Sequence, residues 1–301
     1  MSVPAAYLAV VLIWSTTPLG IVWSTESITP TFAVFARMLI AVAVGVLFLK
    51  LFRIPLPWHK QAVRLYAYAS IGIAGGMILG YNASVYITSG VMSLIFGLSP
   101  IISGVLAKCV DPKQKTTSYQ YIALLICVTG LSLVCSENLQ LNPDSWKGIV
   151  LITGSVTCFS LSGVLVKTVK LEINPFASTM GSLILSTPIF GLAWLMLTNG
   201  EINLEQWQLH SVWAVIYLGI FGSLIGFIAY YYILQKLTAT TVALVTLITP
   251  PIALILGAWL NQEVISQSIL LGASLILLGL GLYQFGGKLL FFKAIDNKQL
   301  E

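Results

Sequence analysis

Charge is what this chain of 301 residues has least of: only 8% of its residues are Asp, Glu, Lys or Arg, while 57% are hydrophobic. Soluble globular proteins carry about 25% charged residues. A chain with so few charges could not cover its folded surface with polar groups in water, which excludes a soluble protein of one or two domains. The composition predicts an integral membrane protein that has the lipid bilayer as a partner.

Side chains that could carry catalysis or hold a metal are also scarce. The chain has two histidines, His59 and His210, which both fall between apolar stretches, and four cysteines without a Cys-x-x-Cys pair. Catalytic and metal sites need clustered acids, histidines or thiolates. We therefore expect a protein that is not an enzyme and has no metal and no cofactor. An intramembrane lipid-modifying enzyme is the least favoured alternative.

Long apolar runs take the place of charge. A membrane-crossing helix needs about 20 mostly apolar residues, and the runs 40–49 and 270–282 are apolar on every face, unlike the alternating strands of a β-barrel. The first run lacks the basic segment of a signal peptide, so we expect it to be retained as a helix. Charged and turn residues divide the sequence into ten predicted transmembrane helices over residues 4–23, 31–51, 64–86, 90–107, 118–136, 147–166, 176–197, 211–234, 239–260 and 265–286.

The few charges are sorted by side. With the N-terminus inside, the inner loops and a cytoplasmic tail over residues 289–301 hold most of the 15 basic residues, and the outer loops hold only Lys147. Because Lys and Arg accumulate on the cytoplasmic side, both termini are predicted to be cytoplasmic. The net charge of +5 is then a signal of topology, and no nucleic-acid partner is needed to explain it. The outer loops are instead acidic, at Glu26, Glu137, Asp144, Glu201, Glu205 and Glu263.

Three segments recur in order at a separation of about 145 to 150 residues. The pairs are 29–32 with 174–176, 72–76 with 222–226, and 88–100 with 238–250. Five helices in each unit would insert the second copy upside down, and inverted repeats are typical of secondary transporters. We predict an all-α membrane protein in which residues 1–138 form a first five-helix repeat and residues 139–288 form a second, inverted one.

These paired segments resemble the EamA-type branch of the drug/metabolite transporter superfamily. The matching residues are Trp14-Ser-Thr-Thr-Pro18, Pro30 with Ala36-Arg37, the Ser-Gly and Leu-Ser-Pro100 pieces of 89–100, and Ala239-Thr-Thr, Thr249-Pro250, Leu260 and Glu263. The sequence departs from the family pattern at Asp111-Pro112, which replace a Gly-Glu pair, and at Gln262, which precedes Glu263. The resemblance implies ten helices, alternating access, and transport or export of small organic solutes such as amino acids, drugs and other metabolites.

Arg37 is the one charged residue placed clearly within an apolar stretch. It lies about seven residues into the second predicted helix, or roughly 10 Å deep at 1.5 Å per residue. A charge at this depth usually faces a cavity or a partner. Either Arg37 contacts a substrate carboxylate or phosphate, or it has a structural or gating role, bonded to backbone carbonyls or to Glu26. Its counterpart at the repeat spacing is Ser182.

Aromatic and small polar residues gather at midplane depths. Such residues could form an amphipathic pocket for a solute with an apolar body and a few polar groups, or serve only helix packing and interfacial belts. Trp14-Ser15 matches Phe159-Ser160 at the repeat spacing, which predicts that both lie beside the pseudo-two-fold axis. With Arg37, the predicted substrate-binding residues are Trp14, Ser15, Tyr81, Asn82, Phe159, Ser160, Tyr230 and Thr246.

Prolines and glycines interrupt several of the apolar stretches. Pro18, Pro100 and Pro250 are candidate gating bends, or else fixed kinks, because proline removes a backbone donor. The glycines of 72–80 and 222–226, spaced by four residues, are expected to let helices approach closely.

The function predicted from these features is secondary transport by alternating access. The protein would export or exchange small organic metabolites, such as amino acids or amphipathic drug-like solutes, in a bacterial inner membrane. No Asp or Glu lies in the middle of an apolar stretch, which disfavours proton coupling and favours facilitated diffusion or exchange. A channel-like facilitator is the alternative. The sequence favours neither a monomer nor a homodimer.

Overall fold

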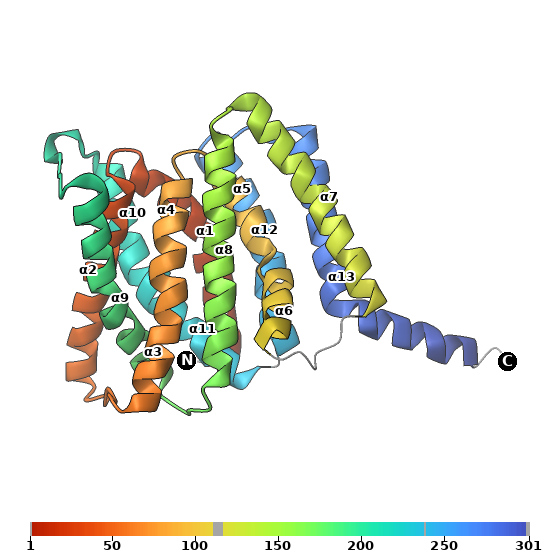
Figure 1. Ribbon diagram of the computed structural model, residues 1–301, viewed down its shortest axis with the longest axis horizontal. Helices are drawn as coiled ribbons and strands as arrows, with labels where there is room; N and C mark the ends of the chain where they lie inside the picture. Colours follow the sequence, from red (N-terminus) through yellow and green to blue (C-terminus); the bar gives the residue numbers. More distant parts are fainter. Residues whose placement is uncertain (1, 111–116, 238, 299–301) are drawn as a thin grey trace.

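The computed structural model describes residues 2–110, 117–237 and 239–298. Within them every regular element is helical, and the helices pack side by side along one common direction (Figure 1). The elements are α1 Val3–Thr25, α2 Pro30–Leu51, α3 Lys60–Ser70, η1 Ile71–Gly76, α4 Met77–Ala83, α5 Ser89–Gly97, α6 Ser99–Val110, α7 Ser118–Leu141, α8 Ser145–Thr168, α9 Pro175–Thr198, η2 Leu204–Gln206, α10 Leu209–Tyr217, η3 Leu218–Ile225, α11 Gly226–Lys236, α12 Ala239–Leu260 and α13 Gln267–Lys298.

The described residues contain ten membrane crossings. Nine continuous helical stretches are long and apolar enough to span a bilayer, and α12 contributes the shorter apolar helix Leu244–Leu260. Three crossings are composite: the third consists of α3, η1 and α4, the fourth of α5 and α6, and the eighth of α10, η3 and α11. Each crossing overlaps one of the ten predicted stretches, so the all-α membrane fold expected from the sequence is confirmed.

The two ends of the bundle are distinguished by the chain termini and by the connections between helices. Both chain termini lie at the same end (Figure 1), which we call the termini end. The connections from α1 to α2, from α7 to α8 and from α12 to α13 lie at the opposite end. Glu263 belongs to the last of these connections, and we call this the Glu263 end. Helix α7 packs mainly on α13, and this pair stands at the edge of the bundle (Figure 1).

Three helices begin or end away from their predicted limits by four residues or more, and one of them is α7, which ends at Leu141 instead of the predicted 136. Helix α3 starts at Lys60, before the predicted 64–86, because the imidazole of His59 accepts a hydrogen bond from the backbone N–H of Ala62 at 3.4 Å and caps a polar first turn. Helix α13 continues to Lys298 through the segment expected to be a tail, and its last part bends away from the bundle (Figure 1).

The predicted bends at Pro100 and Pro250 differ from each other. The fourth crossing is interrupted at Leu98, where α5 ends and α6 begins with Pro100 in its first turn. The ninth crossing, α12, continues through Pro250 and Pro251, and α1 likewise continues through Pro18. Asp111 and Pro112, where the sequence departs from the family pattern, lie outside the described residues.

The third and eighth crossings each contain a π-helical segment, η1 and η3, at positions about 150 residues apart. π-helical turns are rare in proteins, and those that occur are often found at functional sites. The glycines of these segments approach the opposite half of the chain closely. A Cβ on Gly72 would lie 2.8 Å from the Cβ of Ser162, and one on Gly222 would lie 2.9 Å from Nη2 of Arg37. The close approach expected at these glycines is confirmed.

Candidate functional site

Arg37 is buried at the point where the two halves of the chain meet. Its side chain is only 1% exposed, and the residue lies about two turns into α2. Its Nε donates to Oγ of Ser223 in η3 at 2.7 Å, and its Nη1 donates to the hydroxyl of Tyr81 in α4 at 3.3 Å. The guanidinium carbon lies 5.8 Å from the centroid of the Tyr81 ring, within the range of a cation–π contact. One hydroxyl from each half therefore orients the arginine.

Glycines of η3 make the room that Arg37 occupies. A Cβ on Gly219 would lie 3.0 Å from the backbone oxygen of Arg37 and also 3.0 Å from the Cβ of Ile40. With Gly222 against the guanidinium, one turn of η3 lies directly on α2. No larger residue fits at these positions without moving α2 or the arginine.

The charge of Arg37 has no acidic partner among the described residues. Lys147 pairs there with Asp144 at 2.8 Å, and Nδ1 of His210 lies 3.4 Å from the carboxylate of Glu26. Glu26 is therefore engaged elsewhere, and the suggestion that it pairs with Arg37 is wrong. Buried charges are normally paired with an opposite charge, and a guanidinium matches a carboxylate or phosphate in two parallel hydrogen bonds. The arrangement has the chemistry to accept an anion.

A second pair of predicted site residues meets between α1 and α11. The rings of Trp14 and Tyr230 lie 4.8 Å apart at an angle of 36°, and Nε1 of Trp14 would lie 3.4 Å from a Cβ on Gly226. Ser15 beside them is fully buried, and its hydroxyl has no hydrogen-bond partner in the described part of the chain. The two rings therefore lie together between α1 and α11, the helix that follows η3.

A third aromatic contact involves the repeat counterpart of Trp14. The Phe159 ring lies 5.8 Å from that of Phe96 and covers Gly76 of η1, where a Cβ would be 2.5 Å from its ring. Ser160 donates from its hydroxyl to the backbone oxygen of Ser99 at 3.2 Å. Trp14 thus lies against Gly226, the first residue of α11, and Phe159 lies against Gly76, the last residue of η1, two glycines 150 positions apart.

Two predicted residues remain, Asn82 in α4 and Thr246 in α12. Asn82 donates to the backbone oxygen of Ile78 at 2.8 Å in its own helix. Thr246 is half-buried in α12, with its backbone oxygen 3.7 Å from a Cβ placed on Gly97, and Pro250 lies 3.2 Å from the same point. The structure therefore groups the predicted residues in separate contacts, of which only the Arg37–Tyr81 contact contains a charge.

Sequence reasoning missed Ser223, which makes the shortest hydrogen bond to Arg37. The available signal was its place within 222–226, the segment that matches 72–76. A serine among apolar residues of a membrane helix is too common to single out, and its contact with α2 depends on the packing of η3.

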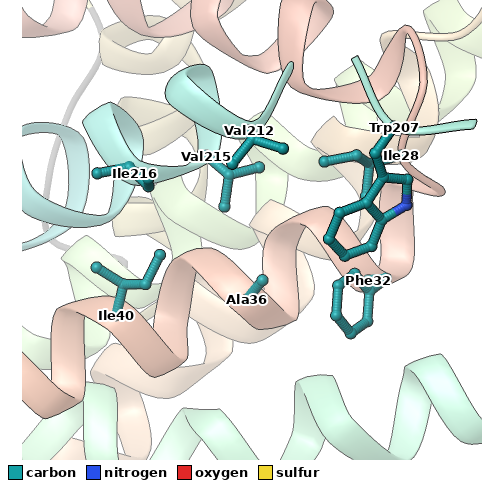
Figure 2. Close-up of a pocket in the computed structure, with 8 residues that line it drawn as sticks. All are labelled: Ile28, Phe32, Ala36, Ile40, Trp207, Val212, Val215 and Ile216. Atoms are coloured by element: carbon teal, nitrogen blue, oxygen red, sulfur yellow. The ribbon is translucent and has the colours of Figure 1, made fainter. Parts of the chain in front are cut away.

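An apolar crevice that Arg37 does not line opens between α2 and α10 (Figure 2). Its volume is about 290 Å³. Figure 2 shows Phe32, Ala36 and Ile40 in a row on α2, facing side chains of α10. The lining residues are Ile28, Phe32, Ala36, Ile40, Trp207, Val212, Val215 and Ile216. None of the predicted site residues lines it.

Comparison with known proteins decides the family. The model of the EamA-like transporter family matches residues 3–136 and again residues 146–285. The chain belongs to the EamA-like transporter family. It therefore has the fold of that family, with ten transmembrane helices arranged as two inverted five-helix repeats, and it is a multi-pass membrane transporter. The resemblance inferred from the sequence is confirmed.

Several relatives of this EamA-like chain carry transporter names. It is 26% identical to Protein PagO of Salmonella typhimurium, over 90% of this chain and 89% of that protein. It is 23% identical to the inner membrane transporter YedA of Escherichia coli, over 98% and 96% of the two chains, and 25% identical to a transporter of Archaeoglobus fulgidus, over 73% and 77%. A solved crystal structure shares the fold with a TM-score of 0.64 at 17% identity, covering 94% of this chain and 97% of that one.

Proposed function

We propose that this EamA-like protein is a secondary transporter that exports or exchanges small organic metabolites by alternating access. Inverted repeats support this mechanism because exchanging the conformations of the two halves produces the opposite-facing state. The basic residues gathered on one side, together with the inner membrane named for the relative YedA, support a bacterial inner membrane with both termini in the cytoplasm. Transporter names among the relatives favour transport over catalysis.

The substrate class we propose is a small solute that carries a carboxylate or phosphate, such as an amino acid or an acidic metabolite. The observation behind it is the buried Arg37, held by Tyr81 and Ser223 without an acidic partner in the described chain. The solute's anionic group would bind the guanidinium, and Trp14, Tyr230 and Phe159 would contact its apolar part.

The experiment that tests this substrate class compares amino acids with their amides. Purified protein is screened by thermal shift against metabolites, and each hit is followed by counterflow in proteoliposomes. Arg37→Ala should lower the affinity for carboxylate-bearing hits by about a hundredfold, because one charge-assisted bidentate contact is lost. The corresponding amides should bind the variant and the unmodified protein equally.

The control for charge alone is Lys147→Ala, which removes an exposed cation that pairs with Asp144. We expect this variant to bind both ligand sets normally. Equal loss of acids and amides in Arg37→Ala would contradict the proposal and assign Arg37 to structure or gating.

A channel-like facilitator is the second candidate function, and saturable counterflow separates the two. A disulfide that holds one end of the bundle closed should abolish carrier flux in both directions, and saturable counterflow should be present before crosslinking. Flux that does not saturate and shows no counterflow would favour a channel.

A further inference from the structure

Glu263 joins the two repeats at the Glu263 end. Its carboxylate accepts a hydrogen bond from the backbone N–H of Ser89 at 2.9 Å and another from that of Gly90 at 3.1 Å. These N–H groups belong to the first turn of α5, where backbone donors have no partner within the helix. Glu263 lies between α12 and α13, so a side chain of the second repeat caps a helix of the first.

The carboxylate is part of a chain of hydrogen bonds that reaches α1. The Asn261 side-chain amide donates to Oε1 of Glu263 at 3.2 Å, and Nε1 of Trp23 donates to Oδ1 of Asn261 at 2.9 Å. The bonds therefore connect α1, α5 and the end of α12 across the boundary between the repeats.

Two glycines form the seat of this carboxylate. A Cβ on Gly257 would lie 2.5 Å from Oε2 of Glu263 and 2.8 Å from the hydroxyl oxygen of Ser89. A Cβ on Gly90 would lie 2.6 Å from Cδ1 of Leu254. The Ser89 hydroxyl is fully buried and has no partner in the described chain. Glycine at positions 90 and 257 therefore allows α5, α12 and the Glu263 carboxylate to come this close.

The packing of the fourth and ninth crossings differs between the two ends. Helix α12 packs along α5, the half of the fourth crossing that starts at the Glu263 end, and makes few contacts with α6, the half toward the termini end. The two crossings are therefore held together where Glu263 lies and separate beyond the interruption at Leu98.

We propose that the Glu263 carboxylate is a latch that keeps the outer end of the transporter closed, and that it must leave the first turn of α5 each time this end opens. The proposal rests on the alternating access proposed above and on the assignment of the Glu263 end to the outside. The latch is strong enough to matter because its hydrogen bonds are charge-assisted and the anion lies at the positive end of the α5 dipole. Glu263 is therefore a positioning residue that sets the balance between closed and open states.

Cysteine reactivity measures this balance without knowledge of the substrate. Ser93 lies one turn below Ser89 on α5 and is 3% exposed. In full-length protein with the four native cysteines replaced by serine, a Ser93→Cys thiol should react slowly with a membrane-impermeant maleimide added from outside. Glu263→Gln should raise that rate about tenfold, because the amide has one acceptor oxygen in place of two, so its NH2 group would face one of the two backbone N–H donors, and because the amide carries no charge.

A second variant and two controls separate the latch from misfolding. Gly257→Ala should raise the rate similarly, since the added methyl group would push the carboxylate away from α5 although residue 263 is still glutamate. Gly281→Ala is the matched control, because a Cβ there has no atom within 4 Å, and Glu205→Gln removes an exposed outer acid. Both controls should leave the rate unchanged. An unchanged rate in both Glu263→Gln and Gly257→Ala would overturn the latch.

A reporter at the other end distinguishes failure of the latch from failure of alternating access. Ser103 is half-buried on α6, toward the termini end. The same maleimide added to inside-out vesicles reaches the opposite side of the membrane, and there Glu263→Gln should lower the reactivity of Ser103→Cys. The reactivity of Ser93→Cys, measured from outside, should rise in the same variant. A rise at Ser93 without a fall at Ser103 would retain the latch but contradict alternating access. No change at either reporter would contradict the latch alone.

Discussion

The position of Arg37 depends on one missing methyl group. Gly222 of η3 leaves the space in which the guanidinium lies, and a Cβ there would be 2.9 Å from Nη2. Gly222→Ala should therefore destabilise the protein by about 1–3 kcal/mol, the usual range for overpacking a well-filled interior. Thermal denaturation in detergent measures the change. The control Gly163→Ala adds the same methyl group where no atom lies within 4 Å and should cause no loss.

The two hydroxyl partners of Arg37 should contribute unequally. Ser223→Ala should lower the free energy of unfolding by about 1.5–3 kcal/mol, because it removes the shorter hydrogen bond, 2.7 Å, from a buried cation. Tyr81→Phe should cost less, since its bond is 3.3 Å and the ring that faces the guanidinium is kept. Ser136→Ala, at an exposed serine bonded within its own helix, is the reference. A larger loss for Tyr81→Phe would contradict this ranking.

At the scale of elements, the interruption between α5 and α6 distinguishes the fourth crossing from the ninth. Pro100→Ala should allow a continuous helix through residue 98 and change the angle at which α6 leaves α12. Counterflow of an identified substrate should fall by about tenfold in this variant. Pro188 lies inside the continuous α9, so Pro188→Ala should leave the rate within about twofold. Equal loss in the two variants would show that the interruption has no special role.

The sequence predicted the elements well because a membrane helix satisfies its own backbone hydrogen bonds. Its length and apolar content are local properties, and all ten stretches were found. The contacts of the site are not local. The Arg37–Ser223 bond joins residues 186 positions apart, and the Glu263–Gly90 bond joins residues 173 positions apart. Pattern analysis could single out Arg37 for its charge, but it could not show that Arg37 bonds Ser223 or that Glu263 caps α5.

At the scale of the whole molecule, the distribution of acids bears on energy coupling. All ten Asp and Glu residues lie outside the middle of the apolar stretches, whereas carriers driven by protons commonly use a buried carboxylate or histidine. Counterflow in proteoliposomes should therefore change less than about twofold when a pH gradient is imposed. The same vesicles with a substrate gradient and no pH gradient provide the control. Uphill accumulation driven by the pH gradient would contradict facilitated diffusion or exchange.

A π-helical turn contains one more residue than an α-helical turn. This extra residue rotates the helix that follows it about the helix axis. Each residue of an α-helix turns the chain by about 100°, so α11 presents a different face to α1 than an uninterrupted helix of the same composition would. Tyr230 meets Trp14 in this rotated setting. Deleting one residue within Leu218–Ile225 would leave a helix that is still long and apolar enough to span the membrane. The deletion would, however, rotate Tyr230 by about a quarter of a turn away from Trp14. Two chains with near-identical hydropathy profiles can therefore present different side chains of α11 to α1, according to whether this one position is occupied.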